Sequence, residues 1–131
     1  MQEEILKNLK TYFESQDEVV LAFLFGSRAE GRARESSDWD IGVYFRPTKH
    51  LELETKYNYQ GEDDIRRDIP ALVGTEVDIV VLNRARPSLV FDVLNSGVEI
   101  VNKDEILYLK LLSKTHYEAI DYWQFVKNLH E

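Results

Sequence analysis

The sequence predicts an α/β or α+β fold, in which a short mixed β-sheet is flanked by helices and followed by a long C-terminal helix. Three observations carry this prediction. Short apolar runs alternate with segments of helical periodicity along the chain, which is typical of mixed sheets with helices packed on them. The first apolar run, VVLAFLF at residues 19–25, is continuous, as in a strand buried on both faces. The last segment, from Asp104 to about residue 130, keeps apolar residues at largely helical spacing.

The first half of the chain contains four expected elements. Residues 3–15 place apolar side chains at helical spacing and predict an amphipathic helix, which the strand at 19–25 follows. WDIGVYF, residues 39–45, predicts a second strand, which Arg-Pro ends. The polar stretch from about residue 50 to residue 72 is expected to be mostly helical.

The second half adds a strand, a helix, an edge strand and the terminal helix. EVDIVVL, residues 76–82, predicts a third strand, and Gly74 marks the turn before it. Pro87 suits the first turn of a helix through residue 95, and Gly97 suits its C-terminal cap. VEIV, residues 98–101, is expected to form a short edge strand. Asp104 is expected to cap the terminal helix.

Length, charge and composition exclude several classes of protein. A chain of 131 residues predicts one domain, residues 1–131, with a core at about 19–101 and a terminal helix at about 104–130. No apolar run approaches the length needed to cross a membrane, and the acidic start MQEEILKNLK does not read as a secretory signal. The absence of cysteine fits a cytoplasmic protein. A net charge of −8 disfavours a nucleic-acid partner, because such binding depends on cations.

A locally basic stretch, GSRAEGRARESSDWD, follows the first strand at residues 26–40. Gly26 can turn sharply and let a ligand approach the backbone. If a helix begins near Ser27, its hydroxyl and first free amides form a site for phosphate oxygens, to which Arg28 adds charge. The alternative is an ordinary serine helix cap. Gly26 and Gly31 have the spacing of a Walker A loop, but the Arg-Ala that follows lacks its lysine and hydroxyl, so that motif is rejected.

Two aspartates end this stretch. Asp38 and Asp40 lie two residues apart, so in a strand their side chains project from the same face. Ionised carboxylates so close repel unless a cation lies between them, and their hard oxygens suit Mg²⁺ or Mn²⁺. A solvated turn at the strand entry is the alternative.

A third aspartate, Asp78, stands in the otherwise apolar strand at 76–82. An isolated buried carboxylate there would be costly without a partner. If this strand pairs with the one that carries Asp40, the three carboxylates share a face and can hold one or two metal ions. The alternative is an edge-strand residue that faces water.

Together these residues carry a family resemblance. Gly26-Ser27, ten intervening residues, Asp38-Trp39-Asp40 and the later Asp78 resemble the GSx₁₀DxD signature of the DNA polymerase β superfamily of nucleotidyltransferases. The small size and the form GSRAEG…SDWD are similar to the minimal nucleotidyltransferases, the MNT or MntA antitoxins that accompany HEPN toxins. The resemblance covers about residues 19–101 and implies a nucleotidyltransferase fold.

The resemblance also implies roles for the residues that match. Gly26 and Ser27, with Arg28 beside them, would hold the triphosphate of ATP. Asp38, Asp40 and Asp78 would be the catalytic residues and ligands of two Mg²⁺ ions, with Mn²⁺ possible, and Asp78 would help deprotonate the acceptor hydroxyl. One position departs from the family pattern GSxARG, because Glu30 replaces its arginine.

The expected function follows from the same resemblance. It implies a protein adenylyltransferase that transfers AMP from ATP to a tyrosine of its cognate HEPN toxin, an RNase, and so neutralises it in a hetero-oligomer. Two alternatives stay open: an antitoxin that blocks the toxin by binding alone, and a nucleotidyltransferase that acts on a small-molecule hydroxyl. The terminal helix also carries aromatic residues that either pack on the domain or face a partner. His50, His116 and His130 form no metal-ligand pattern.

Overall fold

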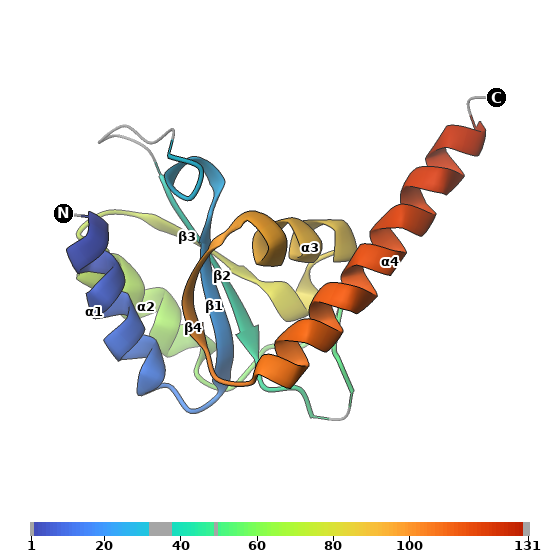
Figure 1. Ribbon diagram of the computed structural model, residues 1–131. Coiled ribbons are helices and arrows are strands. Elements are labelled where there is room, and N and C mark those ends of the chain that lie inside the picture. Colours follow the sequence, from blue (N-terminus) through green and yellow to red (C-terminus); the bar gives the residue numbers. More distant parts are fainter. Residues whose placement is uncertain (1, 32–37, 49, 130–131) are drawn as a thin grey trace.

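A four-stranded sheet forms the centre of the protein in a computed structural model (Figure 1), which describes residues 2–31, 38–48 and 50–129. The strand order is β3-β2-β1-β4. β1 (Val19–Phe25) runs antiparallel to both β2 (Trp39–Phe45) and β4 (Val98–Asn102), whereas β3 (Val77–Val81) runs parallel to β2. The mixed sheet expected from the sequence is therefore confirmed, with VEIV in an edge strand.

Helices cover both faces of this sheet. α1 (Gln2–Glu14) and α2 (Glu62–Val73) lie on one side, and α3 (Pro87–Ser96) and the first half of α4 (Glu105–Leu129) lie on the other (Figure 1). Each side has its own apolar core, one including Phe13, Ile41 and Ile69, and the other including Phe23, Val93 and Leu111. β1 lies between both layers, which explains why its sequence is continuously apolar.

The ends of the last two helices follow from particular residues. Asp104 caps α4, because its Oδ1 accepts a hydrogen bond of 3.0 Å from the Leu107 backbone N–H. Gly97 ends α3 in extended backbone, and its N–H donates to the Val93 carbonyl at 2.9 Å. A Cβ at Gly97 would lie 2.4 Å from that carbonyl oxygen, so the close approach of the chain requires glycine here.

The expectation of helix over residues 50–72 is wrong for the first part of that stretch. Helix α2 begins only at Glu62, after an irregular segment. The hydroxyl of Tyr44 accepts a bond of 2.8 Å from the Glu52 N–H and donates to the Glu52 carbonyl, while the Thr55 N–H donates to the Asn83 carbonyl. These tertiary bonds take backbone groups that a helix would use within itself.

No helix in the described ranges is both long and apolar enough to cross a membrane.

Candidate active site

The turn after β1 brings glycine against a carboxylate. Gly26 has φ of +78°, in the region that glycine adopts without strain. A Cβ built on it would meet the Asp40 Oδ2 at 2.5 Å. Both the backbone angle and the space therefore require glycine, and Asp40 lies directly against the turn.

The turn itself differs from the expectation of a helix that starts near Ser27. Residues Gly26–Arg28 form a single 3₁₀ turn, closed by bonds from the Ala29 and Glu30 N–H groups to the Gly26 carbonyl. The following residues 29–31 form a turn, and Arg32 and Arg34 fall outside the described residues. An anion at Ser27 would thus meet a short turn rather than the end of a long helix.

The three aspartates of the sequence motif come together at one end of the sheet. In the parallel pairing of β2 and β3, Asp40 lies directly opposite Asp78. Residues opposite each other in neighbouring strands project from the same face. Asp38 immediately precedes β2 and lies two residues before Asp40, so the alternation of a strand places both side chains on the same face.

Electrostatics confirm this proximity at Asp40. The pKa of Asp40 is raised, first by burial and then by the negative charges of Asp78 and Asp38. Asp40 is half-buried, whereas Asp38 and Asp78 are exposed. Asp78 is therefore both an edge-strand residue open to water and a neighbour of Asp40. The expectation that burial would force a partner on it was wrong, but its expected pairing with Asp40 is confirmed.

This donor set fits a divalent ion by its chemistry. Carboxylate oxygens are the ligands that Mg²⁺ and Mn²⁺ prefer. A cation would reverse the repulsion that raises the pKa of Asp40. Within the described ranges no group of three Asp, Glu or His side chains is already gathered closely enough to hold a metal ion. The carboxylates share a face, but they would have to draw together around an ion.

Arg28 is turned to the other face of the sheet. Its guanidinium carbon lies 4.6 Å from the centre of the Trp39 ring, and its Nη1 donates to the Gln2 Oε1 at 3.4 Å. Trp39 belongs to the core under α1 and α2. In this arrangement the Arg28 charge lies on the side of the sheet away from Asp40.

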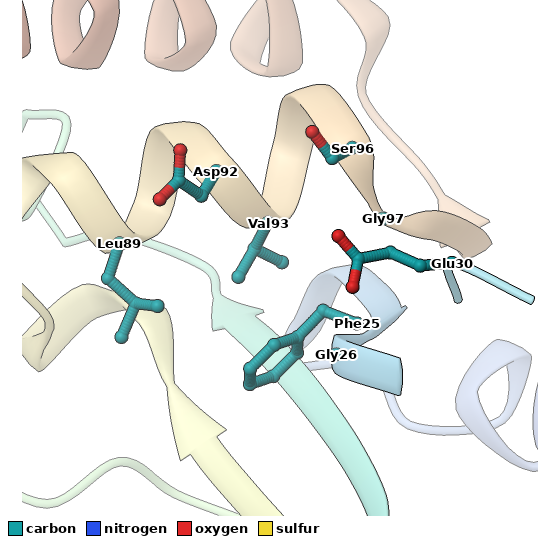
Figure 2. Close-up of a pocket in the computed structure, with 8 residues that line it drawn as sticks. All are labelled: Phe25, Gly26, Glu30, Leu89, Asp92, Val93, Ser96 and Gly97. Atoms are coloured by element: carbon teal, nitrogen blue, oxygen red, sulfur yellow. The ribbon is translucent and has the colours of Figure 1, made fainter. Parts of the chain in front are cut away.

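A pocket of about 330 Å³ opens beside Gly26, between the turn and α3. Figure 2 shows the Glu30 side chain reaching toward the end of α3 at Ser96, with Asp92 one turn earlier on that helix. The pocket is lined by Phe25, Gly26, Glu30, Leu89, Asp92, Val93, Ser96 and Gly97. Its volume is in the range of small-ligand sites.

Sequence reasoning missed the α3 side of this pocket. Leu89, Asp92, Val93 and Ser96 recur at spacings of three and four, so they share one face of the helix. Two polar residues on an otherwise apolar face were the available signal. The contact of that face with the Gly26 turn comes only from the folded chain.

Comparison with known proteins identifies the family of this chain. A family model described as "Polymerase beta, Nucleotidyltransferase" matches residues 7–106. A Methanocaldococcus jannaschii protein, provisionally named a protein adenylyltransferase, is 32% identical over 83 residues, which are 63% of this chain and 81% of that protein.

Solved structures show the same fold. A chain in the crystal structure of a toxin-antitoxin with AMP-PNP is similar with a TM-score of 0.66 and 21% identity, over 95% of this chain and 98% of that one. A chain in the complex of a tri-AMPylated Shewanella oneidensis HEPN toxin with an MNT antitoxin is similar with a TM-score of 0.63 and 20% identity, over the full length of both.

Proposed function

Because this chain belongs to the polymerase β nucleotidyltransferase family, we propose that it is an antitoxin that transfers AMP from ATP to a tyrosine of its cognate HEPN toxin. The observation that carries the enzymatic part is the register that places Asp40 opposite Asp78, with Asp40 against Gly26. The similarity to a protein adenylyltransferase and to toxin-antitoxin complexes supports the protein acceptor.

We assign the site residues as follows. Asp38, Asp40 and Asp78 would hold two Mg²⁺ ions, with Mn²⁺ as a substitute, and Gly26 and Ser27 would bind the triphosphate. Arg28 would contribute to nucleotide binding after leaving the Trp39 ring. When bound, the ions neutralise phosphate charge and lower the pKa of the attacking hydroxyl.

The reaction forms one bond and breaks another. The tyrosine oxygen attacks the α-phosphorus of ATP, the bond to the pyrophosphate leaving group breaks, and the hydroxyl proton passes to a carboxylate. Asp78 is exposed and therefore accessible to an acceptor that approaches from solvent. Because residue 26 is glycine, Asp40 can lie directly against the turn that would bind the triphosphate. In phosphoryl transfer, such positioning of the reacting groups and electrostatic stabilisation supply most of the catalysis.

We also propose that the chain forms a hetero-oligomer with this toxin in the cytoplasm. ATP is available there, and the lack of cysteine is compatible with a reducing compartment.

The test is a labelling and neutralisation assay with the cognate toxin, ATP and Mg²⁺. Wild-type protein should add a mass of AMP to a toxin tyrosine and abolish the toxin's RNase activity. Asp40→Asn should slow labelling by about 1,000-fold, because several kcal/mol of charge stabilisation are lost with a metal ligand.

The matched control is Asp63→Asn, which removes an exposed carboxylate from the first turn of α2, away from the site. It should label the toxin at the wild-type rate. Neutralisation by Asp40→Asn without any AMP transfer would show that the antitoxin acts by binding alone. Adenylylation of a small-molecule hydroxyl in preference to the toxin would show that the protein is a nucleotidyltransferase of small molecules.

A further inference from the structure

Helix α4 continues well beyond the part of the protein that it packs against. Its first half contacts α3, with Leu111 and Thr115 buried and His116 stacked on Phe91 at 4.8 Å between ring centres. Figure 1 shows the second half extending away from the sheet and the other helices. Seven of the ten exposed large hydrophobic residues in the described part of the chain lie on this one helix.

Five of these seven residues share one face of α4. Their successive spacings are three, eight, three and three residues, with Ser113 midway across the gap of eight, and they are 52–71% exposed. This stripe, which we call the outer stripe, consists of Ile106, Leu109, Tyr117, Ile120 and Trp123. Such spacing over more than four turns is that of a helix that packs against another helix.

The outer stripe is complementary to itself when reversed. If two copies of α4 lie antiparallel with their centres between Lys114 and Thr115, Ile106 meets Trp123, and Leu109 meets Ile120. At the centre, Tyr117 is level with Leu112 of the other copy, and the small exposed Ser113 lies one residue further along. Apolar residues are therefore level with apolar residues at both ends and near the centre of the contact, which suits interdigitated packing.

The charges beside the outer stripe follow the same symmetry. Lys110 and Lys114 lie in the first half of the stripe's length, and Glu118 and Asp121 lie in the second half. In the reversed pair Lys110 of one copy flanks Asp121 of the other, on both sides of the twofold axis. A parallel pair would instead place like charges together, which is unfavourable.

A hollow at one end of the stripe can take a large side chain. It lies between α4 and the segment after β2, has a volume of about 580 Å³ and is half apolar and half polar, with Pro47, His50, Leu51, Asp104, Ile106, Leu107, Lys110 and Lys114 lining it. The indole of Trp123 from a second copy would lie over Ile106 at the edge of this hollow. Aromatic residues that fill a partner's pocket are typical anchors of interfaces.

We propose that two copies of this chain associate through their outer stripes, as an antiparallel pair of α4 helices. The occupant of this face is a second copy because both the apolar residues and the charges repeat about one twofold axis, as an isologous interface requires. The buried residues of α4, Leu111 and Thr115, face the rest of the domain and are not part of the outer stripe. This proposal does not depend on the proposed function.

The first test is the mass in solution of the full chain without toxin. Sedimentation equilibrium should give twice the chain mass of 15.4 kDa at micromolar concentrations. Ile120→Asp should weaken association at least 100-fold, because it places a charge in the apolar contact. The matched control is Leu72→Asp, the same kind of change at an exposed residue of α2, and should leave the dimer intact. A monomeric wild type at all concentrations would overturn the proposal.

The second test asks for the antiparallel register. Lys110→Glu and Asp121→Lys should each weaken the dimer about threefold to tenfold, and the double variant should restore it. The chain has no cysteine, so single cysteines can be introduced cleanly. A mixture of Leu109→Cys and Ile120→Cys proteins should oxidise to the mixed disulfide. Disulfides between two Leu109→Cys chains in preference to the mixed product would show a parallel pair and contradict the proposal.

Discussion

The two ends of strand β2 differ in how their polar side chains are paired. At its beginning, Asp38 and Asp40 lie beside Asp78, and the pKa of Asp40 is raised, first by burial and then by the charges of these two neighbours. At its far end, the buried Asn83 side chain accepts from the Phe45 N–H at 2.8 Å and donates to the Phe45 carbonyl at 2.9 Å. Among the described residues, every buried side-chain nitrogen and oxygen has a hydrogen-bond partner.

A carboxylate at the far end shows the contrast most clearly. Glu62 is 6% exposed and lies against Arg84, with a distance of 2.5 Å between Arg84 Nη2 and Glu62 Oε2, and Arg66 adds a second ion pair. The hydrogen bonds from Arg84 lower the pKa of Glu62 to about 2. One end of the sheet thus pairs its carboxylate with arginines, whereas the other places carboxylates beside one another.

The largest expected effect is on stability at the far end, through Glu62. Its lowered pKa contributes about 3 kcal/mol of unfolding free energy, present above the unfolded pKa near 4.5 and lost as pH falls toward 2. Glu62→Gln should lose most of this contribution at pH 7. Urea unfolding between pH 6 and pH 2 should show a smaller fall in stability for Glu62→Gln than for wild type. Equal falls would show that the ion pair with Arg84 contributes nothing.

The second effect compares glycines at the two ends. Gly26→Ala should destabilise by roughly 2–3 kcal/mol, because alanine at positive φ is strained and its Cβ displaces Asp40. It should also lower AMP transfer by about 100-fold, the usual consequence of a 1 Å misplacement. Both are measured by urea unfolding and toxin labelling.

Gly61→Ala is the matched control at the far end. Gly61 has a similar φ of +88°, but nothing lies within 4 Å of an added Cβ. It should cost about 1 kcal/mol of stability and leave the labelling rate unchanged. Equal activity loss in both variants would mean that the contact with Asp40 has no role.

The third effect is a gain in stability at the active end. Asp40→Asn removes one of the mutually repelling charges and should stabilise the metal-free protein by roughly 0.5–2 kcal/mol at pH 7. Because the pKa of Asp40 is raised on folding, wild-type stability from this group is lost as pH rises through that pKa. The gain from Asp40→Asn should therefore shrink as pH falls below the ordinary aspartate range. Melting temperatures in a chelating buffer measure it, and a destabilised Asp40→Asn would contradict the assigned repulsion.

The smallest effect concerns Glu30, which lies in the pocket beside Gly26. Glu30→Arg replaces a negative charge near the proposed triphosphate site by a positive one. Calorimetry with Mg²⁺ and a non-hydrolysable ATP analogue should show binding tighter by about threefold to tenfold. Glu30→Gln, which only removes charge, should give a smaller gain. Weaker binding by both variants would instead assign Glu30 to direct nucleotide contact.

The sequence predicted the strands well because their signals are local. The continuous apolar run of β1 and the mostly apolar run of β2 follow from burial, and the shared face of Asp38 and Asp40 follows from the period of a strand. From the sequence, Asp40 and Asp78 could be expected to share a face only on the condition that their two strands pair. It depends on the parallel register of β2 with β3, which no local pattern sets.

The failures of prediction arise from long-range contacts. The composition of residues 50–58 is compatible with a helix. In the fold, however, backbone N–H groups of this segment donate to the Tyr44 hydroxyl and to the Asn83 carbonyl. The position of Arg28 on Trp39 likewise depends on residues far apart in the chain, including Gln2 of α1, which accepts a hydrogen bond from Arg28. In each case tertiary hydrogen bonds or stacking outweighed local preference.

Asp78 lies on β3, which is the outermost strand of the described sheet and pairs with β2 alone. Enzymes that enclose their reactive groups in a cleft limit the size of what they can modify. Here Asp78 is exposed on an edge strand, which is the position that the proposed transfer to a side chain of another folded protein requires.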